Sequence, residues 1–398
     1  MSVDLAKLRD QYRHALREDV IPFWLKHSPD REHGGYFTCL NRDGSVFDTD
    51  KFVWLQARQV WMFSKFFNAL EPRPEFLEMA KLGATFLRDY GRAANGDFYF
   101  ALDRTGRPLV QPYSIFSDCF ATMAFAQYGR ATGLEWATEI STRTFERILK
   151  RWENPKGQYN KLYPGSRPLK SMVLPMITVN LAMEVGTALP AYPVEEVIRE
   201  NLHALMDTFV DRRAKLIFEN VAPDGSHPDT FDGRIINPGH GIECMWFVMD
   251  AAHAYGESSL IARAADALED QLAFGWDEQY GGIFYFRDAL GKPPQQLEWD
   301  QKLWWVHVET LIALLLGWKL TRRESLLQWY EHVHDYTWSH FPDPQYGEWY
   351  GYLNRQGEVL LPLKGGKWKG CFHVPRGLMK CAEIVESLAR QTTPPPAA

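Results

Sequence analysis

The chain has 398 residues, of which 45% are hydrophobic and 24% charged, a composition typical of a globular protein with a large core. Its formal net charge of −6 provides no basic field for nucleic acid or for an anionic membrane, so we expect neither as a partner. The longest apolar run, LIALLL at residues 311–316, is far shorter than the roughly 20 residues of a membrane-spanning helix.

The two ends of the chain and its cysteines indicate a cytoplasmic protein. Residues 1–20 alternate charged and apolar side chains at helical spacing and lack the apolar core of a secretion signal. Residues 391–398, QTTPPPAA, have no apolar periodicity and are expected to form a disordered tail after a single domain over residues 1–390. The cysteines show no CxxC spacing, which favours reduced thiols and no bound metal. They are Cys39, Cys119, Cys244, Cys371 and Cys381.

A glycine and aromatic motif of the kind that forms a β-hairpin recurs along the chain, each time before a helical pattern of bulky residues. Successive motifs start about 60 to 65 residues apart, enough for two helices and a short antiparallel ribbon. In chain order the six motifs begin at Gly35, Gly96, Gly157, Leu216, Gly282 and Gly347.

We call the helical pattern after each motif an inner helix. A second helical pattern lies between each inner helix and the next motif. The predicted outer helices are Pro74–Tyr90, Leu134–Trp152, Val194–Val210, Ser258–Phe274 and Arg323–Phe341. Because an amphipathic helix must bury its apolar stripe, alternating inner and outer helices predict an all-α fold, an (α/α)6 barrel with short antiparallel hairpins gathered at one end. Polar residues from different repeats would meet at that end and form a pocket.

Two histidines open predicted inner helices. His240 follows the turn Asn237-Pro238-Gly239, and Glu243 lies one turn further along the same face, where its carboxylate could orient the imidazole. The positive end of the helix dipole is expected to keep His240 neutral. His373 follows Gly370-Cys371-Phe372 in the same way. The alternative for each histidine is a capping or buried structural role.

Glu309 and Arg58 are charged residues within apolar helical patterns. An unpaired charge is costly there, so Glu309 needs a polar cavity or a partner, and a salt bridge with Arg58 is one possibility. The Arg58 guanidinium suits an oxygen anion. Tryptophans are individually more typical of a core, but as a group they suit stacking on a sugar. The candidates are Trp54, Trp61, Trp246, Trp304, Trp305 and Trp368.

Motifs of other chemistries are absent from the sequence. It has no HExxH, no GxSxG and no strand-glycine-helix dinucleotide fingerprint, so neither a metal nor a nicotinamide cofactor is implied. The loop at residues 156–170 is basic but lacks the GxxxxGK[ST] spacing. It fits either a phosphate contact or a solvated turn, and the loop at residues 364–370 has the same two interpretations. The cations of the first loop are Lys156, Lys161, Arg167 and Lys170.

Long blocks of the sequence carry a family resemblance. They are EHGGYFTCL, KFVWLQARQVW, INPGHGIE, QQLEWDQKLWWVH, DPQYGEWYGYL and KGGKWKGCFHVPR. In this order they resemble the N-acylglucosamine 2-epimerase family, which includes the renin-binding proteins, over nearly the whole chain. The resemblance implies an (α/α)6 barrel, usually a homodimer, that inverts carbon 2 of N-acetylglucosamine or N-acetylmannosamine.

The resemblance also implies site residues. His240 and His373 fall on the acid/base histidines of the family, and its other active-site polar residues fall on Arg58, Glu243, Glu309 and Arg376. We expect substrate contacts from Arg376 and from Trp54, Trp304, Trp305 and Trp368. Family members commonly need ATP as an activator that is not consumed, and the 156–170 loop resembles the region proposed to bind it.

The implied chemistry suits two histidines. One can remove the proton at carbon 2 of the open-chain sugar to give an enolate, and the other can return a proton from the opposite face. Arg58 could stabilise the enolate oxygen. The alternatives are another sugar isomerase on this barrel, such as an oligosaccharide 2-epimerase or an aldose-ketose isomerase, an inverting glycosidase with paired carboxylates, or a renin-binding-like protein module.

Overall fold

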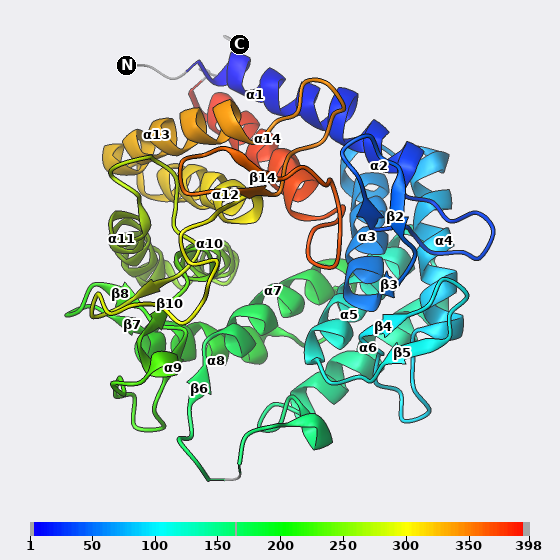
Figure 1. The fold of residues 1–398 in the computed structure, drawn as a ribbon, viewed down its shortest axis with the longest axis horizontal. Coiled ribbons are helices and arrows are strands. Elements are labelled where there is room, and N and C mark those ends of the chain that lie inside the picture. Colours follow the sequence, from blue (N-terminus) through cyan, green and yellow to red (C-terminus); the bar gives the residue numbers. More distant parts are fainter. Residues whose placement is uncertain (1–3, 164, 393–398) are drawn as a thin grey trace, which may run out of the picture.

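A computed structural model describes residues 4–163 and 165–392 of the chain. Long helices form an inner ring, and the chain passes once around it, so that the first and last helices lie side by side (Figure 1). The inner helices are α3 (Val53–Lys65), α5 (Ile115–Thr132), α7 (Val173–Ala188), α10 (Pro238–Ala254), α12 (Trp304–Thr321) and α14 (His373–Thr392).

The outer helices alternate with the inner ones and confirm the predicted (α/α)6 barrel. The outer layer contains α4 (Pro74–Tyr90), α6 (Glu135–Lys150), α8 (Glu195–Ala204) with the π-helical turn η4 (Leu205–Phe209), α11 (Ser258–Gly275) and α13 (Glu324–His340). The sixth outer position is filled from the start of the chain. It holds α1 (Leu5–His14), η1 (Ala15–Val20) and α2 (Ile21–His27), and α1 packs on α14.

The two layers differ in how their apolar residues are distributed. In α12 every residue from Trp304 to Gly317 is buried, because this inner helix has protein on all sides. In α6 the buried residues Ala137, Ile140, Thr144 and Ile148 recur at helical spacing and form one stripe. The sequence pattern therefore assigns each helix to its layer.

Short antiparallel strands cluster between the helices. Two three-stranded sheets each join neighbouring repeats: β3 (Lys51–Phe52) with β4 (Ala101–Leu102) and β5 (Pro108–Val110), and β12 (Lys302–Leu303) with β13 (Tyr352–Leu353) and β14 (Val359–Leu361). The two-stranded pairs are β1 (Cys39–Leu40) with β2 (Val46–Asp48), β7 (Val210–Asp211) with β8 (Leu216–Ile217), and β10 (Ile235–Ile236) with β11 (Arg287–Asp288).

Two predicted elements differ from the structure. The third motif forms no hairpin, because Gly157–Tyr159 is a single 3-10 turn and β6 (Lys170–Ser171) pairs instead with β9 (Asn220–Val221) of the next repeat. The disordered tail was predicted to begin at residue 391, but α14 continues to Thr392. The rest of that stretch, residues 393–398, lies outside the described residues.

Buried polar side chains anchor the hairpins to the helices. In four repeats a side chain of a helix accepts a hydrogen bond from a hairpin amide. The acceptors are Gln56, Asp118, Gln271 and His307, and the amides belong to Tyr36, Phe98, Ile217 and Ile283 respectively. Each bond satisfies a buried backbone donor and fixes its hairpin relative to the inner ring.

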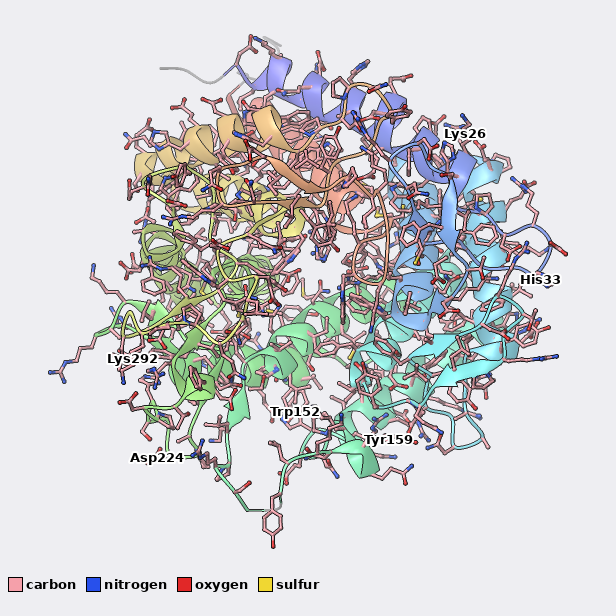
Figure 2. All side chains as sticks on the ribbon, viewed as in Figure 1. Lys26, His33, Trp152, Tyr159, Asp224 and Lys292 are labelled. Carbon is pink, nitrogen blue, oxygen red and sulfur yellow. The ribbon has the colours of Figure 1, made fainter. Side chains whose placement is uncertain are left out.

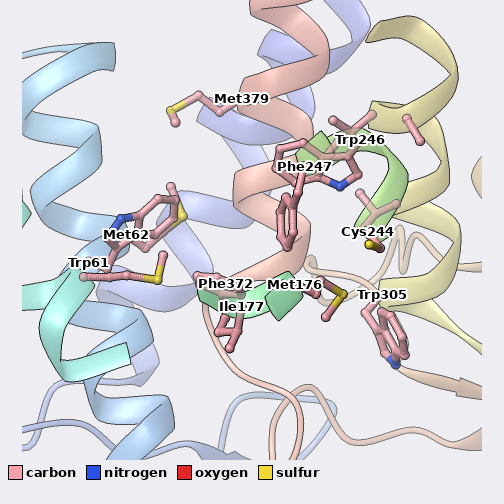
Figure 3. Close-up of a cluster of buried hydrophobic side chains, with 14 of the residues drawn as sticks. Trp61, Met62, Met176, Ile177, Cys244, Trp246, Phe247, Trp305, Phe372 and Met379 are labelled. Atoms are coloured by element: carbon pink, nitrogen blue, oxygen red, sulfur yellow. The ribbon is translucent and has the colours of Figure 1, made fainter. Parts of the chain in front are cut away.

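Large side chains from several inner helices meet inside the ring. Trp61 of α3, Ile177 of α7, Phe247 of α10 and Phe372 just before α14 belong to this buried cluster (Figure 3). All five cysteines are buried and unpaired. Across the described part of the chain, no helix combines the length and the apolarity needed to span a bilayer.

Candidate active site

The rings of His240 and His373 both contact one tryptophan. His240 is the third residue of α10 and His373 the first of α14, so both sit at helix N-termini. The Trp305 ring at the start of α12 lies 5.2 Å from the His240 ring and 5.8 Å from the His373 ring, centroid to centroid. Two imidazoles from distant repeats are therefore brought next to the same indole ring.

His373 is held by a buried carboxylate. Its Nδ1 lies 2.7 Å from Glu309 Oε1, and Glu309 also accepts hydrogen bonds from Arg376 Nη2 at 2.6 Å and Trp246 Nε1 at 3.0 Å. Glu309 thus has the buried partners that its charge was expected to need, and one of them is an imidazole. The ion pair with an arginine that was one expectation for Glu309 is present, but its partner is Arg376 and not Arg58.

Glu243 contacts the opposite helix and makes no hydrogen bond to His240. Its Oε1 accepts from Arg376 Nη2 at 2.7 Å, so Arg376 bridges Glu243 and Glu309. The prediction that Glu243 orients His240 fails because its side chain reaches across the ring to α14 and not back along its own helix. The three buried groups form one ionic cluster beside His373.

The carboxylate that contacts His240 comes from a residue that the sequence did not mark. Glu219 lies in the link between β8 and β9, and its two oxygens are 3.1 and 3.2 Å from His240 Nδ1. Its only sequence signal is a charged side chain following the apolar run Leu216–Phe218. A charged residue after such a short strand is common at a surface, so the sequence alone did not place Glu219 at the N-terminus of α10.

The two histidines have opposite electrostatic surroundings. Burial opposes the charging of His240, but the adjacent Glu219 carboxylate raises its pKa above the usual value, so the predicted effect of the helix dipole does not dominate. Burial and the nearby guanidinium groups of Arg58 and Arg376 lower the pKa of His373 well below the usual value. The pKa values of the two histidines are thus shifted in opposite directions, so His240 holds a proton more readily than a free histidine and His373 less readily.

Arg58, the sixth residue of α3, is held by stacking. Its guanidinium carbon lies 4.3, 4.0 and 4.5 Å from the ring centres of Trp54, Phe120 and Phe372. Its Nε has no hydrogen-bond partner in the described residues. Burial lowers the pKa of Arg58 to about 9, which leaves the group cationic at neutral pH. A stacked guanidinium with unused donors is suited to bind an oxygen anion.

The expected aromatic platform is brought together in part. Trp54 and Trp368 contact each other with ring centres 5.7 Å apart, and Trp368 is half exposed. Trp304 and Trp305 are buried, and both rings contact His373. These rings can line the space beside the imidazoles, and Trp368 is the most exposed of the four.

The cations of the 156–170 loop lie apart from the histidines. The segment projects outward from the ring, with Tyr159 on it (Figure 2). Lys170 belongs to β6 and donates to the Pro223 carbonyl oxygen at 2.9 Å. Within the described residues, Lys156, Lys161 and Arg167 make no recorded contact with the histidine cluster.

Three acidic or imidazole side chains lie close enough together to suggest a metal site. Ligand atoms of Glu243, Glu309 and His373 fall within 4.8 Å of one another. The Arg376 guanidinium already bridges the two carboxylates, with both N–O distances at or below 2.7 Å. A metal ion would have to displace this cation, so the donor set fits Arg376 better than it fits a metal.

The fold and the site define an (α/α)6 barrel in which two histidines contact one tryptophan. Residues 35–374 match the family model of N-acylglucosamine 2-epimerase (GlcNAc 2-epimerase). The N-acylglucosamine 2-epimerase of Bos taurus is 41% identical over 389 residues, covering 94% of this chain and 90% of the bovine protein. The chain therefore belongs to the N-acylglucosamine 2-epimerase family.

Solved structures show the same fold at low sequence identity. Cellobiose 2-epimerase from Bacillus thermoamylovorans superposes with a TM-score of 0.82 at 20% identity, covering 96% of this chain and all of that one. A D-mannose isomerase superposes with a TM-score of 0.80 at 18% identity, covering 97% and 100% of the two chains. These matches establish the shared barrel.

Proposed function

We propose that the protein interconverts N-acetylglucosamine and N-acetylmannosamine by moving a proton at carbon 2 of the open-chain sugar. The observation that carries the proposal is the pair of imidazoles that contact Trp305, each with Nδ1 against a glutamate. In that arrangement Nε2 of each ring is the nitrogen left to face a substrate. Similarity to N-acylglucosamine 2-epimerases over nearly the full length supports the choice of substrate.

The chemistry follows from the acidity of carbon 2, which is adjacent to the aldehyde of the open-chain sugar. One imidazole takes the proton, the carbon–hydrogen electron pair forms a carbon 1–carbon 2 double bond, and the aldehyde oxygen becomes an enolate. The stacked Arg58 guanidinium can stabilise this negative oxygen. The second imidazole then donates a proton to the opposite face of carbon 2, which inverts that centre.

Substitution of each histidine tests the proposal. We expect His240→Gln and His373→Gln each to lower the rate of N-acetylmannosamine conversion by about 10² to 10⁴-fold, because an acid/base group is lost. Circular dichroism and melting should remain those of the parent. His253→Gln, an exposed histidine on the same helix as His240, is the matched control. Full activity of either active-site variant would remove that histidine from the mechanism.

The same assay decides between sugars. Cellobiose and D-mannose, offered in parallel, test the two other isomerase activities that occur on this barrel. Turnover of either in preference to N-acetylmannosamine would replace the proposed substrate while keeping the proton-transfer mechanism.

We also propose a nucleotide activator, with ATP bound but not consumed, at the 156–170 segment. The support is the set of four cations there and the continuity of this segment with β6, which pairs with β9 directly after Glu219. The test is turnover with and without ATP in the parent and in Lys161→Gln; an equal ATP response in both would move the site elsewhere. A cytoplasmic homodimer is part of the proposal, and sedimentation equilibrium measures its mass.

A further inference from the structure

We propose that Glu219 is a positioning residue that makes His240 the proton donor of the resting enzyme, an inference that rests on the proposed epimerase function. Both Glu219 oxygens face one nitrogen, at 3.1 and 3.2 Å from His240 Nδ1. In the described part of the chain, this carboxylate makes no other hydrogen bond. His240 is therefore the side chain that receives the charge-assisted hydrogen bond of Glu219.

The contrast with the second glutamate–histidine pair carries the argument. Glu309 forms hydrogen bonds with three side chains, His373, Arg376 and Trp246. The Arg376 cation neutralises much of its charge, so Glu309 favours a charged His373 less strongly. The Glu219 carboxylate forms its hydrogen bonds with His240. The charged or titratable groups that face His240 are Glu219 from the β8–β9 link, Glu243 from its own helix and His373 from α14. The two acidic groups favour the imidazolium.

The backbone around Glu219 is fixed on both sides. Its carbonyl oxygen accepts from Met172 N at 2.9 Å, and the preceding Phe218 N donates to Phe209 O at 3.0 Å. The following residue, Asn220, pairs with Ser171 in the β6–β9 ribbon. Glu219 itself is buried, at 9% exposure. Because its backbone is fixed in this way, the Glu219 carboxylate can hold the imidazole in one orientation without taking part in the reaction itself.

The two hydrogen-bonded pairs define which histidine accepts a proton and which donates one. Glu219 keeps a hydrogen on His240 Nδ1, so the second proton of the resting imidazolium sits on Nε2. Neutral His373 carries its hydrogen on Nδ1, toward Glu309, and presents a lone pair on Nε2. His373 takes the carbon 2 proton and His240 donates its Nε2 proton to the other face. The enzyme returns to its resting form by exchanging one proton at each histidine with solvent.

Glu219→Gln tests the inference because it keeps the shape and removes the charge. We expect kcat/KM to fall by about 10 to 100-fold with KM nearly unchanged, a charge-assisted hydrogen bond being worth roughly that factor. The alkaline limb of the pH–rate profile should move to lower pH, because an uncharged amide no longer stabilises the imidazolium. Glu219→Asp should restore part of the activity. Glu298→Gln, an exposed carboxylate, is the control and should leave profile and rate unchanged.

The protonation of His240 can be read directly. NMR titration of histidine ring carbons, with the His240 signal assigned by its loss in His240→Gln, should show a lower midpoint in Glu219→Gln than in the parent. An unchanged midpoint, or an unmoved alkaline limb, overturns the inference. This titration needs no sugar, so absence of epimerase activity in the parent would reject the proposed function, whereas an unshifted midpoint would reject the role of Glu219.

Discussion

His307 shows how position decides what a histidine does in this barrel. It is fully buried in α12, where Nδ1 donates to the Leu303 carbonyl oxygen at 2.7 Å and Nε2 accepts from Ile283 N at 3.0 Å. Burial lowers its pKa to about 3. Both ring nitrogens are used inside the protein, so this imidazole cannot exchange a proton with a substrate. His240 and His373 each commit only Nδ1 to a carboxylate.

The buried His307 predicts a pH dependence of stability. The unfolded chain binds a proton near pH 6.5 and the folded protein only near pH 3, so the stabilisation is complete above about pH 6.5 and decreases as pH falls, by about 1.4 kcal/mol per unit. His307→Gln lacks this titration. Between pH 7 and pH 5, urea unfolding of the parent should lose about 2 kcal/mol more than that of the variant. Equal losses would contradict the assignment.

For individual residues, the sequence predicted which side chains form the site better than it predicted their hydrogen-bond partners. His240 and His373 both contact Trp305, and the other expected polar residues, Arg58, Glu309 and Arg376, lie around His373. Hydrogen bonding was harder to predict, because helical spacing places residues on a face but does not say how far a side chain reaches across the ring. For that reason Glu243 was expected to contact His240, whereas the contact is made by Glu219, which the sequence did not mark.

Three sets of ion pairs, which we call ionic clasps, join the hairpins of neighbouring repeats. In each, an aspartate accepts from a buried lysine of its own repeat and from an arginine in the turn of the next hairpin. The sets are Asp30 with Lys51 and Arg104, Asp277 with Lys302 and Arg355, and Asp343 with Lys364 and Arg42. The third set links the last repeat to the first and so closes the ring of hairpins.

Removing the closing carboxylate should be strongly destabilising. Asp343→Asn leaves the fully buried Lys364 ammonium, now 2.9 Å from Asp343 Oδ2, without its counter-ion. We expect a loss of about 3 to 5 kcal/mol in the free energy of unfolding, measured by urea denaturation. Asp335→Asn, at an exposed carboxylate, should change it by less than about 0.5 kcal/mol. A loss in Asp343→Asn no larger than in this control would contradict the role of the clasp.

Elements with a long periodic pattern were predictable, and short irregular ones were not. The outer helix predicted at Pro74–Tyr90 has those bounds in the structure. The 364–370 loop was expected to be a solvated turn or a phosphate contact. Instead, Lys364 and Lys369 are fully buried against Asp343 and Glu348. Nothing local marks a lysine as buried, because the carboxylates that stabilise it come from another part of the hairpin.

The whole molecule is closed by its N-terminal segment. Tyr12, Val20 and Trp24 are fully buried, Tyr12 Oη lies 2.7 Å from Tyr330 Oη, and Trp24 Nε1 donates to Glu348 at 2.6 Å. The first helix thus completes the outer layer beside the last inner helix (Figure 1). The repeat count pointed to a ring, but the helical pattern at the N-terminus gave no sign that it occupies the sixth outer position.

Deletion of residues 1–27 should therefore prevent cooperative folding. The truncation uncovers the apolar surface of α13 and α14 and removes several fully buried side chains, each worth about 2 to 5 kcal/mol, against a total stability of about 5 to 15 kcal/mol. Thermal denaturation followed by circular dichroism should show a broad transition, and gel filtration should show aggregates. A truncated chain that melts sharply at the temperature of the parent would show that the segment is dispensable.

The proposed epimerisation requires two imidazoles to exchange protons with opposite faces of one carbon. Incubation of N-acetylmannosamine with the protein in deuterated water, followed by NMR at carbon 2, tests it most directly. Early in the reaction, the N-acetylglucosamine formed should carry deuterium at carbon 2 while the remaining N-acetylmannosamine keeps its protium. Product that retains the original proton at carbon 2 would contradict the account.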